Sequence, residues 1–160
     1  LEHLIGGHRV VPGDRGIFMP VSRRMHPLVC GFISAAVYES RLHSDQDASL
    51  QDLRSRSGAS LVGAGVRAVH HTGRSQVSPE EIDAILAHIG EIVGSTYRAG
   101  DGSERAVGHA DILVVAPYNA QVNALRTALP PAVRVGTVDR FQGQEAPVCL
   151  VSMTTSRYGV

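Results

Sequence analysis

The chain has 160 residues, 43% of them hydrophobic, which suits one globular domain that buries roughly 70% of its unfolded surface. Aromatic residues make up 4% and Trp is absent, so branched and small aliphatic side chains must fill the core, which favours an α/β layer fold. The 15 basic and 15 acidic residues cancel, which excludes a global electrostatic attraction to nucleic acid or to an anionic membrane; any nucleic-acid contact must be local.

The two cysteines, Cys30 and Cys149, lie far apart and match no metal-binding or redox spacing. We expect both to be small buried side chains in a reducing compartment, which predicts a cytoplasmic location. No apolar run approaches the roughly 20 residues that span a bilayer. The start at Leu1 has neither a charged leader nor an initiator Met, and the end at residues 155–160 has no closing helix or strand. We therefore expect a piece of a longer polypeptide.

The first half of the chain predicts few regular elements. Residues 15–20 have the pattern of a short strand, and the residues after Pro27 have helical spacing with this proline in the first turn. The polar segment 41–60 is predicted to be irregular, and no linker divides the domain. The alternation over 66–70 favours a strand.

A helix is predicted to begin at Ser78, which would be the N-cap, with Pro79 at the first helical position and Glu81 closing a capping box. Apolar residues then recur at three- and four-residue steps and form one stripe for a sheet face. We expect this helix to run to about Tyr97, followed by a Gly- and charge-rich loop over 98–109.

The second half predicts a parallel sheet, because a continuous apolar run typical of a strand buried on both faces is followed by a helix and two further strands. These elements are expected at 111–116, 119–129, 133–135 and 148–151. Right-handed parallel crossovers place ligand loops at the carboxyl ends of strands. We therefore expect the polar loops 117–121 and 137–145 to lie together at that edge.

The segment 135–145 carries most of the functional information. Two polar turns lie between apolar strands, and the carboxylates, amides and glycines of the segment are placed for a ligand. On spacing alone, an ordinary Gly-containing connector between two strands explains the segment equally well.

Three segments in order resemble the second, C-terminal RecA-like domain of Upf-like superfamily 1 helicases, of the AAA_12 type. They are 24–42, which begins RMHP, then 116–122 with the sequence APYNAQV, and 136–145 with the sequence GTVDRFQGQE. The VCGFIS variant at 29–34 is most similar to bacterial members that carry a RecB-like nuclease domain. The resemblance implies one three-layer, RecA-like α/β domain with a mainly parallel sheet over 1–160, without the first RecA-like domain and the final arginine motif.

The resemblance also implies nucleotide contacts. Arg24 would be the catalytic arginine that reaches the γ-phosphate of ATP, where a permanently charged guanidinium stabilises charge on the phosphoryl oxygens; without the family, an Arg here reads as a surface cation. The family often has a Tyr that stacks on adenine where Arg23 stands, and a guanidinium can stack on a ring too. Glu145 would accept hydrogen bonds from the ribose, and Gln142 and Gly143 would shape the loop that joins nucleotide to nucleic acid.

A second set of contacts implied by the resemblance is to single-stranded DNA or RNA. Thr137 would face the backbone of the strand, with Pro117, Tyr118, Asn119 and Gln121 as weaker candidates. Hydroxyl and amide groups at strand ends hold phosphates without reading bases. Tyr118 is equally well explained as a partly buried packing ring.

No metal site is predicted on this chain. His70, His71, His88 and His109 form the obvious set of histidines, but adjacent residues of a strand point to opposite faces, and no Cys or carboxylate spacing supports these four. We expect His26 to start a helix or to pack a loop rather than to bind a ligand.

The resemblance implies that the parent is an ATP-dependent 5′-to-3′ DNA or RNA helicase that uses Mg²⁺. This chain has no phosphate loop and no acidic magnesium motif, which the family carries on its first RecA-like domain. We therefore expect half an active site, completed by the first RecA-like domain of the same polypeptide and inactive alone.

Two other hypotheses for the function are considered, a binding or scaffold module and a free-standing enzyme. The alternative is a non-catalytic RecA-like binding or scaffold module of a nuclease or defence protein, which Arg23 and the missing final motif favour. A free-standing α/β enzyme has no nucleophile elbow or Ser-His-Asp arrangement to support it.

Overall fold

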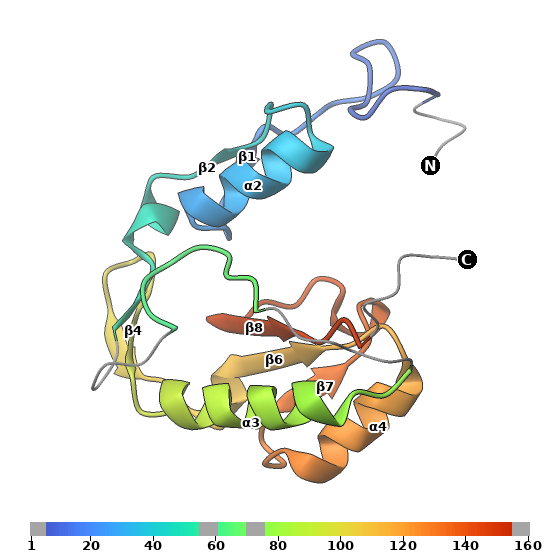
Figure 1. The fold of residues 1–160 in the computed structure, drawn as a ribbon. Helices are drawn as coiled ribbons and strands as arrows, with labels where there is room; N and C mark the ends of the chain where they lie inside the picture. Colours follow the sequence, from blue (N-terminus) through green and yellow to red (C-terminus); the bar gives the residue numbers. More distant parts are fainter. Residues whose placement is uncertain (1–5, 55–60, 70–75, 155–160) are drawn as a thin grey trace. The chain divides into compact units, whose positions relative to one another are not determined.

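The structure is a computed structural model of the chain and describes residues 6–54, 61–69 and 76–154 (Figure 1). The chain divides into two compact units. Among the described residues, the first unit holds 6–53, 63–67 and 98–104, and the second holds 54, 61–62, 68–69, 76–97 and 105–154.

The first unit contains a short parallel pair of strands joined by a helix. Strand β1 (Val21–Ser22) pairs with β2 (His43–Ser44), and α2 (Pro27–Val37) connects them. The helix begins at Pro27 as predicted, because the Nδ1 atom of the N-cap residue His26 accepts a hydrogen bond from the Leu28 N–H at 3.2 Å. The prediction that His26 starts a helix is thereby confirmed.

Three predictions for this part of the chain are wrong. The strand expected at 15–20 lies instead at Val21–Ser22, and the segment 41–60, expected to be irregular, contains β2, the 3₁₀ helix η1 (Asp47–Leu50) and β3 (Asp52–Arg54). Elements of two to four residues are too short for hydrophobic periodicity to reveal. Residues 66–69 of the expected strand 66–70 have no regular structure, and His70 lies outside the described residues.

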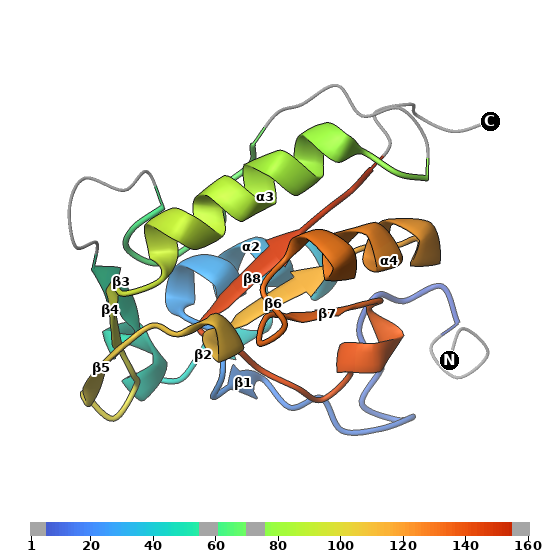
Figure 2. The ribbon, with the colours of Figure 1, turned by 90° about the horizontal axis from the view of Figure 1, so that it is seen from below.

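The second unit is built on a three-stranded sheet in the order β7-β6-β8. Strand β6 (Ile112–Val115) is parallel to both β7 (Arg134–Gly136) and β8 (Val148–Val151). Helix α4 (Asn119–Ala128) joins β6 to β7, and α3 (Pro79–Ile92) lies beside α4 on the same face of the sheet (Figures 1 and 2). The predicted α/β class with a mainly parallel sheet is confirmed.

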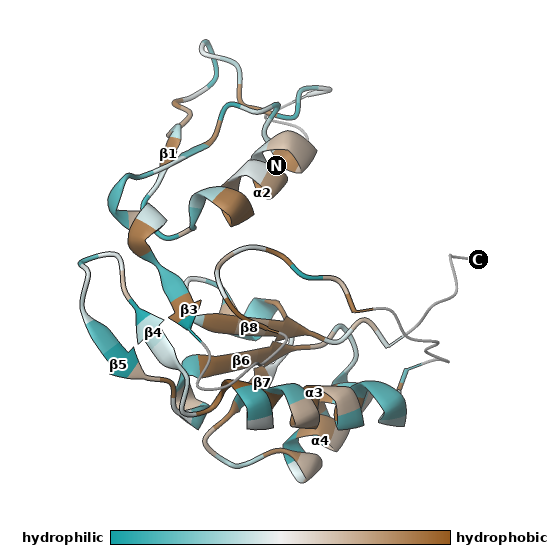
Figure 3. Cartoon of the chain, turned by 60° about the vertical axis from the view of Figure 1, so that its left-hand side comes forward, coloured by the Kyte–Doolittle hydropathy of each residue, from teal (hydrophilic) through white to brown (hydrophobic). Residues whose placement is uncertain are grey.

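The core of the second unit lies between this sheet and its two helices, and Figure 3 shows β6 and β8 as hydrophobic along their length. Of the apolar stripe predicted for α3, Ile85 and Ile89 pack inward because they recur on one side of the helix, whereas Leu86 is 42% exposed, so its predicted burial is wrong. The buried side chains include Ile85, Ile89, Ile92, Ile112, Val114, Val122, Leu125 and Val135. No helix among the described residues is long and apolar enough to cross a membrane.

The two cysteines, both predicted to be buried, lie in different elements and differ in exposure. Cys30, in α2 of the first unit, is buried as expected, but Cys149 is exposed, so its predicted burial is wrong. Side chains alternate along β8, and Cys149 and Val151 are its two exposed positions, with Val151 60% exposed. An edge position, which periodicity does not reveal, explains the difference.

The end of α3 also differs from the prediction. The helix stops at Ile92 rather than near Tyr97, because Gly94 takes a left-handed φ of 84°, a conformation that commonly ends helices. Residues Thr96–Arg98 form β4, which lies between β3 and β5 (Glu104–Ala106) in a second three-stranded sheet. The predicted loop 98–109 therefore contains the end of β4, β5 and the start of the 3₁₀ helix η2 (His109–Asp111).

Candidate functional site

The carboxyl ends of β6 and β7 bring the starts of the two predicted ligand loops together. Val115 pairs with Gly136 in the parallel register, and the Ala116 N–H donates to the Gly136 carbonyl at 3.1 Å. Pro117 and Thr137 follow directly on the two strands. They therefore lie at the same edge of the sheet, as the crossover pattern predicts.

This edge is accessible and offers groups suited to an anion. Pro117, Tyr118 and Asn119 are exposed, and Thr137 is half-buried. Asn119 is the first residue of α4, whose N-cap residue Tyr118 makes no side-chain capping hydrogen bond. The N–H groups and the positive dipole end of α4 therefore start at this edge, an arrangement that favours a phosphate. Tyr118 is 36% exposed, so both of its interpretations, packing ring and ligand contact, stay open.

Gln121 does not lie on this accessible edge. Its side chain is fully buried, and its Oε1 accepts from the Ser78 N–H at 3.0 Å. Its Nε2 donates to Ser152 Oγ at 2.9 Å and to the Ser78 carbonyl at 3.4 Å. The polar atoms of Gln121 are thus used inside the protein, and the structure does not support its prediction as a strand contact. These hydrogen-bond partners lie 43 and 31 residues away in the sequence, so local sequence patterns do not predict this buried role.

Glu81 completes this buried network at the amino end of α3. Ser78 Oγ accepts from the Glu81 N–H at 3.3 Å, as expected of an N-cap, but the Ser78 N–H donates to Gln121. The Glu81 carboxylate accepts from the Thr154 N–H at 2.8 Å and from Ser152 Oγ. The predicted capping box is therefore present in one half only, and Glu81 links α3 to the chain that leaves β8.

Sequence reasoning missed Glu81, Ser152 and Thr154 as one network, although one signal was present. Glu81 stands four residues before Ile85 on the stripe that α3 buries, where an acidic residue is unusual. Thr154 has a left-handed φ of 62°, which is uncommon for a β-branched residue. The hydrogen bond from its N–H to Glu81 holds this conformation in place.

The loop that follows β7 is folded against the end of its own strand. A Cβ atom at Gly136 would lie 2.8 Å from Arg140 Cδ and 3.0 Å from Phe141 Cε2, both on the 3₁₀ helix η3 (Asp139–Phe141). A residue with a Cβ here would require the Arg140 and Phe141 side chains to shift away from the end of β7. Gln142 and Gly143 follow as an exposed turn, in which Gly143 takes a left-handed φ of 80°.

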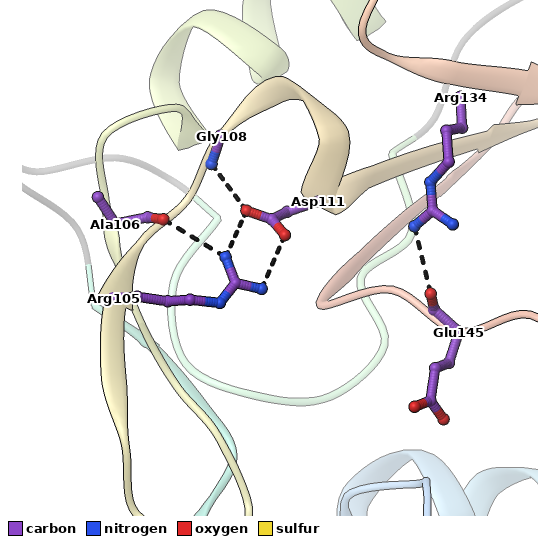
Figure 4. Close-up of polar contacts among 6 residues, drawn as sticks. All are labelled: Arg105, Ala106, Gly108, Asp111, Arg134 and Glu145. Carbon is purple, nitrogen blue, oxygen red and sulfur yellow. Dashed lines mark hydrogen bonds and ion pairs between the residues drawn. The ribbon is translucent and has the colours of Figure 1, made fainter.

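The second half of this loop returns to the opposite end of the sheet. Arg134 begins β7, and its Nη1 and Nη2 donate to Gln144 Oε1 at 3.3 Å and to the Glu145 carbonyl at 3.2 Å (Figure 4). The prediction that all of 137–145 lies at the carboxyl ends of the strands is therefore wrong for Gln144 and Glu145. A connection between parallel strands must travel back to the amino end of the next strand, here β8.

The two predicted arginines belong to the first unit, whereas the other predicted contacts belong to the second. Arg23 and Arg24 are exposed between β1 and α2. Arg23 Nε lies 3.9 Å from the Asp45 carboxylate, and the Arg24 carbonyl accepts from Gln51 Nε2 at 3.3 Å. Both side chains are thus presented at the surface of their own unit.

An ion pair supports the amino end of β6. Arg105 donates to both carboxylate oxygens of Asp111 at 2.6 and 2.7 Å, and the Gly108 N–H donates to the same carboxylate at 2.8 Å (Figure 4). The hydrogen bonds from Arg105 hold the pKa of Asp111 below its ordinary value. This pair is structural and lies outside the predicted contacts.

A metal centre has no support in the part of the chain that the structure describes, where no three His, Cys, Asp or Glu side chains group together in a way that would hold an ion. Of the four histidines considered, His70 and His71 lie outside the described residues. His88 Nδ1 lies 3.9 Å from the Glu91 carboxylate on the same helix.

The parallel sheet, its covering helices and the loops at its edges define an α/β domain of the RecA-like class. A profile of the AAA_12 family, described as an AAA domain, matches residues 10–159, and the chain belongs to this family. The resemblance to the C-terminal RecA-like domain of Upf-like superfamily 1 helicases is thereby confirmed.

Curated relatives agree with this assignment. The chain is 26% identical over 155 residues to the DNA-binding protein SMUBP-2 of Rattus norvegicus and of Mus musculus, a match that covers 86% of this chain and 15% of each relative. It is 27% identical over 151 residues to the DNA polymerase alpha-associated DNA helicase A of Schizosaccharomyces pombe, covering 87% of this chain and 23% of the relative. The chain thus spans less than a quarter of the length of these relatives.

Proposed function

We propose that this chain is the C-terminal motor domain of an ATP-dependent DNA or RNA helicase, to which it contributes arginine and ribose contacts to ATP and backbone contacts to a single strand. One observation carries the proposal. The loop 137–145 begins beside Pro117 at one end of the sheet and finishes with Glu145 near Arg134 at the other. A single segment therefore connects the proposed strand contact to the proposed nucleotide contact.

The nucleotide contacts are proposed for side chains whose chemistry fits ATP. Glu145 is exposed, and its carboxylate oxygens are acceptors that match the hydroxyl donors of a ribose. Arg24 is an exposed guanidinium that would stabilise charge on the γ-phosphate, and Arg23 would stack on the adenine. Gln142 and Gly143 form the turn that sets the path of the chain toward Glu145. When bound, ATP supplies the free energy of hydrolysis, and Mg²⁺ neutralises its phosphates.

The contacts to single-stranded nucleic acid are proposed for the residues that follow the carboxyl ends of β6 and β7. Thr137 offers a hydroxyl, and Asn119 offers an amide and the start of α4. Pro117 and Tyr118 complete the accessible surface between them. These groups hold phosphates and sugars without distinguishing bases, as a motor that moves along any sequence requires.

The completing partner is proposed to be the first RecA-like domain of the same polypeptide, which would hold the magnesium ion. For this reason the 160-residue chain alone should neither hydrolyse ATP nor unwind a duplex. Magnesium-dependent ATP turnover by the purified chain that Arg24→Ala abolishes would contradict this part of the proposal. A nuclease domain in the parent and a cytoplasmic location stay predictions.

The central experiment uses the complete polypeptide that carries this chain. Arg24→Ala should lower kcat for ATP by roughly 10³-fold, in the range of other arginines that contact a transferring phosphoryl group, with little change in strand affinity. Thr137→Ala should raise the Kd for a single strand and weaken its stimulation of ATP turnover. Thr127→Ala is the matched control, because Thr127 is exposed on α4 and bonds only the Asn123 carbonyl among the contacts described.

The second candidate is a binding or scaffold module whose ATPase activity has been lost. The observation that favours it is Arg23 at the position where the family often has a stacking Tyr, with Arg23 lying 3.9 Å from Asp45. This candidate predicts strand binding without ATP turnover in the complete polypeptide. Unchanged strand-stimulated turnover in both Arg24→Ala and Thr137→Ala would show that the residue assignments are wrong.

A further inference from the structure

We propose that Arg134 is a positioning residue for Glu145, which fixes the backbone from which the Glu145 carboxylate reaches the ribose of a bound nucleotide. The inference rests on the proposed nucleotide contact of Glu145. It adds a residue that lies outside the three segments assigned by family resemblance, and it assigns this residue a role in nucleotide affinity rather than in hydrolysis.

The contacts of Arg134 show what it holds. Its two terminal nitrogens bind two consecutive residues, Gln144 through the side-chain oxygen at 3.3 Å and Glu145 through the backbone carbonyl at 3.2 Å. In Figure 4 the Glu145 carboxylate points away from the Arg134 guanidinium. Arg134 therefore orients the main chain of Glu145 and does not neutralise its carboxylate.

The segment that carries Glu145 needs such an anchor, because residues 142–147 contain neither helix nor strand. Gln144 adds a second attachment: its N–H donates to the Phe141 carbonyl at 2.9 Å and its Nε2 donates to the Arg140 carbonyl at 3.2 Å. Gln144 thus joins η3 to Arg134. The position of Glu145 is set from η3 on one side and from β7 on the other.

Arg134 itself is held by the sheet. It pairs with Leu113 in the parallel register of β7 with β6, and its Nε is buried without a hydrogen-bond partner among the residues that the structure describes. A buried donor without a partner costs free energy. The two hydrogen bonds to Gln144 and Glu145 offset the free-energy cost of the unsatisfied Nε, so they stabilise the Arg134 side chain in this position.

The test compares nucleotides in the complete polypeptide. Arg134→Ala should raise the KM for ATP about tenfold with kcat within about twofold, because a ground-state and transition-state contact is lost equally. With 2′,3′-dideoxyadenosine triphosphate, which lacks both ribose hydroxyl donors, wild type and Arg134→Ala should share the same KM. Arg134→Lys, which keeps one donor group, should give an intermediate KM for ATP.

Arg126→Ala is the matched control. Arg126 Nη2 donates to the Val135 carbonyl at 2.9 Å. Like Arg134, it therefore binds a backbone oxygen, but this oxygen belongs to β7 and not to residues 144–145. Its removal should leave the KM for both nucleotides unchanged. This control separates the effect of losing an arginine that stabilises β7 from the effect of losing the arginine that orients Glu145.

Glu145→Ala distinguishes failure of the inference from failure of the proposed function. If Glu145→Ala leaves the KM for ATP unchanged, the ribose contact is wrong and the role of Arg134 falls with it. If Glu145→Ala raises that KM but Arg134→Ala behaves like Arg126→Ala, the inference alone is overturned. An equal rise for ATP and for the dideoxy nucleotide in Arg134→Ala would also overturn it, since general loosening of the fold does not depend on ribose hydroxyls.

Discussion

At the scale of single residues, the Arg105–Asp111 pair makes stability depend on pH. Because Arg105 lowers the pKa of Asp111 in the folded state, the pair stabilises the fold above the unfolded pKa of about 3.9. That stabilisation is lost as the pH falls through the lower folded value. The Arg105 side chain is 52% exposed, so the contribution is screened and amounts to about 1 kcal/mol.

We therefore predict that Arg105→Ala lowers the free energy of unfolding by about 1 kcal/mol at pH 7 and by much less near pH 2. Urea denaturation of wild type and variant at both values measures the difference. A deficit that stays the same at low pH would instead assign the effect to the Tyr97 ring, whose centroid lies 5.5 Å from the Arg105 guanidinium.

The close approach of η3 to Gly136 gives a second prediction at this scale. Gly136→Ala places a Cβ against Arg140 and Phe141 and should lower the free energy of unfolding by about 1–3 kcal/mol. Gly90→Ala is the control, since Gly90 lies in the last turn of α3, a Cβ there meets nothing within 4 Å, and alanine in place of glycine in a helix stabilises by about 0.5–1 kcal/mol. The Tm should fall for Gly136→Ala and rise for Gly90→Ala. Equal shifts of Tm in the two variants would mean that η3 does not pack against Gly136 as described.

At the scale of elements, the buried network of Gln121 joins the amino ends of α3 and α4 to the chain after β8. Ser78, Glu81, Ser152 and Thr154 are its other members, each at most 5% exposed. Hydrogen-bonded groups of this kind specify one arrangement of elements, because any partner left alone costs its full desolvation.

Gln121→Leu should therefore lower the free energy of unfolding by about 2–4 kcal/mol, since it leaves the Ser78 N–H and Ser152 Oγ short of partners. Asn123→Ala, an exposed amide two residues along the same helix, should change it by less than about 0.5 kcal/mol. Chemical denaturation measures both. A Gln121→Leu variant of normal stability that binds a single strand more than about tenfold more weakly would restore the original prediction of a strand contact.

The sequence predicts elements well where a period repeats and poorly where it does not. Helices α3 and α4 and strand β6 were predicted because apolar spacing persists over them, and the His26 and Ser78 helix starts because each precedes a proline. The two- and three-residue strands β1 to β5 carry no such period. The buried hydrogen bonds of Gln121 were not predicted because its partners are distant in sequence. Glu145 was misplaced because the path of a loop depends on where the next strand begins.

At the scale of the whole molecule, the balanced charge of the chain limits how a strand can be bound. With 15 basic and 15 acidic residues and uncharged groups at the proposed strand edge, few counterions are displaced on binding. The affinity of this chain for a single strand should then respond weakly to salt.

We predict that log Kd for a single strand rises with log salt concentration with a slope of about 1–3, measured by fluorescence anisotropy between low and moderate salt. Thr137→Ala should raise Kd at every salt concentration and leave the slope unchanged, because it removes no charge. A slope above about 5 would indicate binding through a cationic surface elsewhere on the molecule.

The short length of β7 has a consequence for insertions and deletions. Only two residues, Val135 and Gly136, lie between Arg134, which binds Gln144 and Glu145, and Thr137 at the opposite end of the strand, a span of about 10 Å. Side chains alternate along a strand, so adding or removing one residue here would turn either Arg134 or Thr137 to the wrong face of the sheet. The number of residues in this strand is therefore as tightly constrained as their identity, and length variation should be tolerated in the turn at Gln142–Gly143 before it is tolerated in β7.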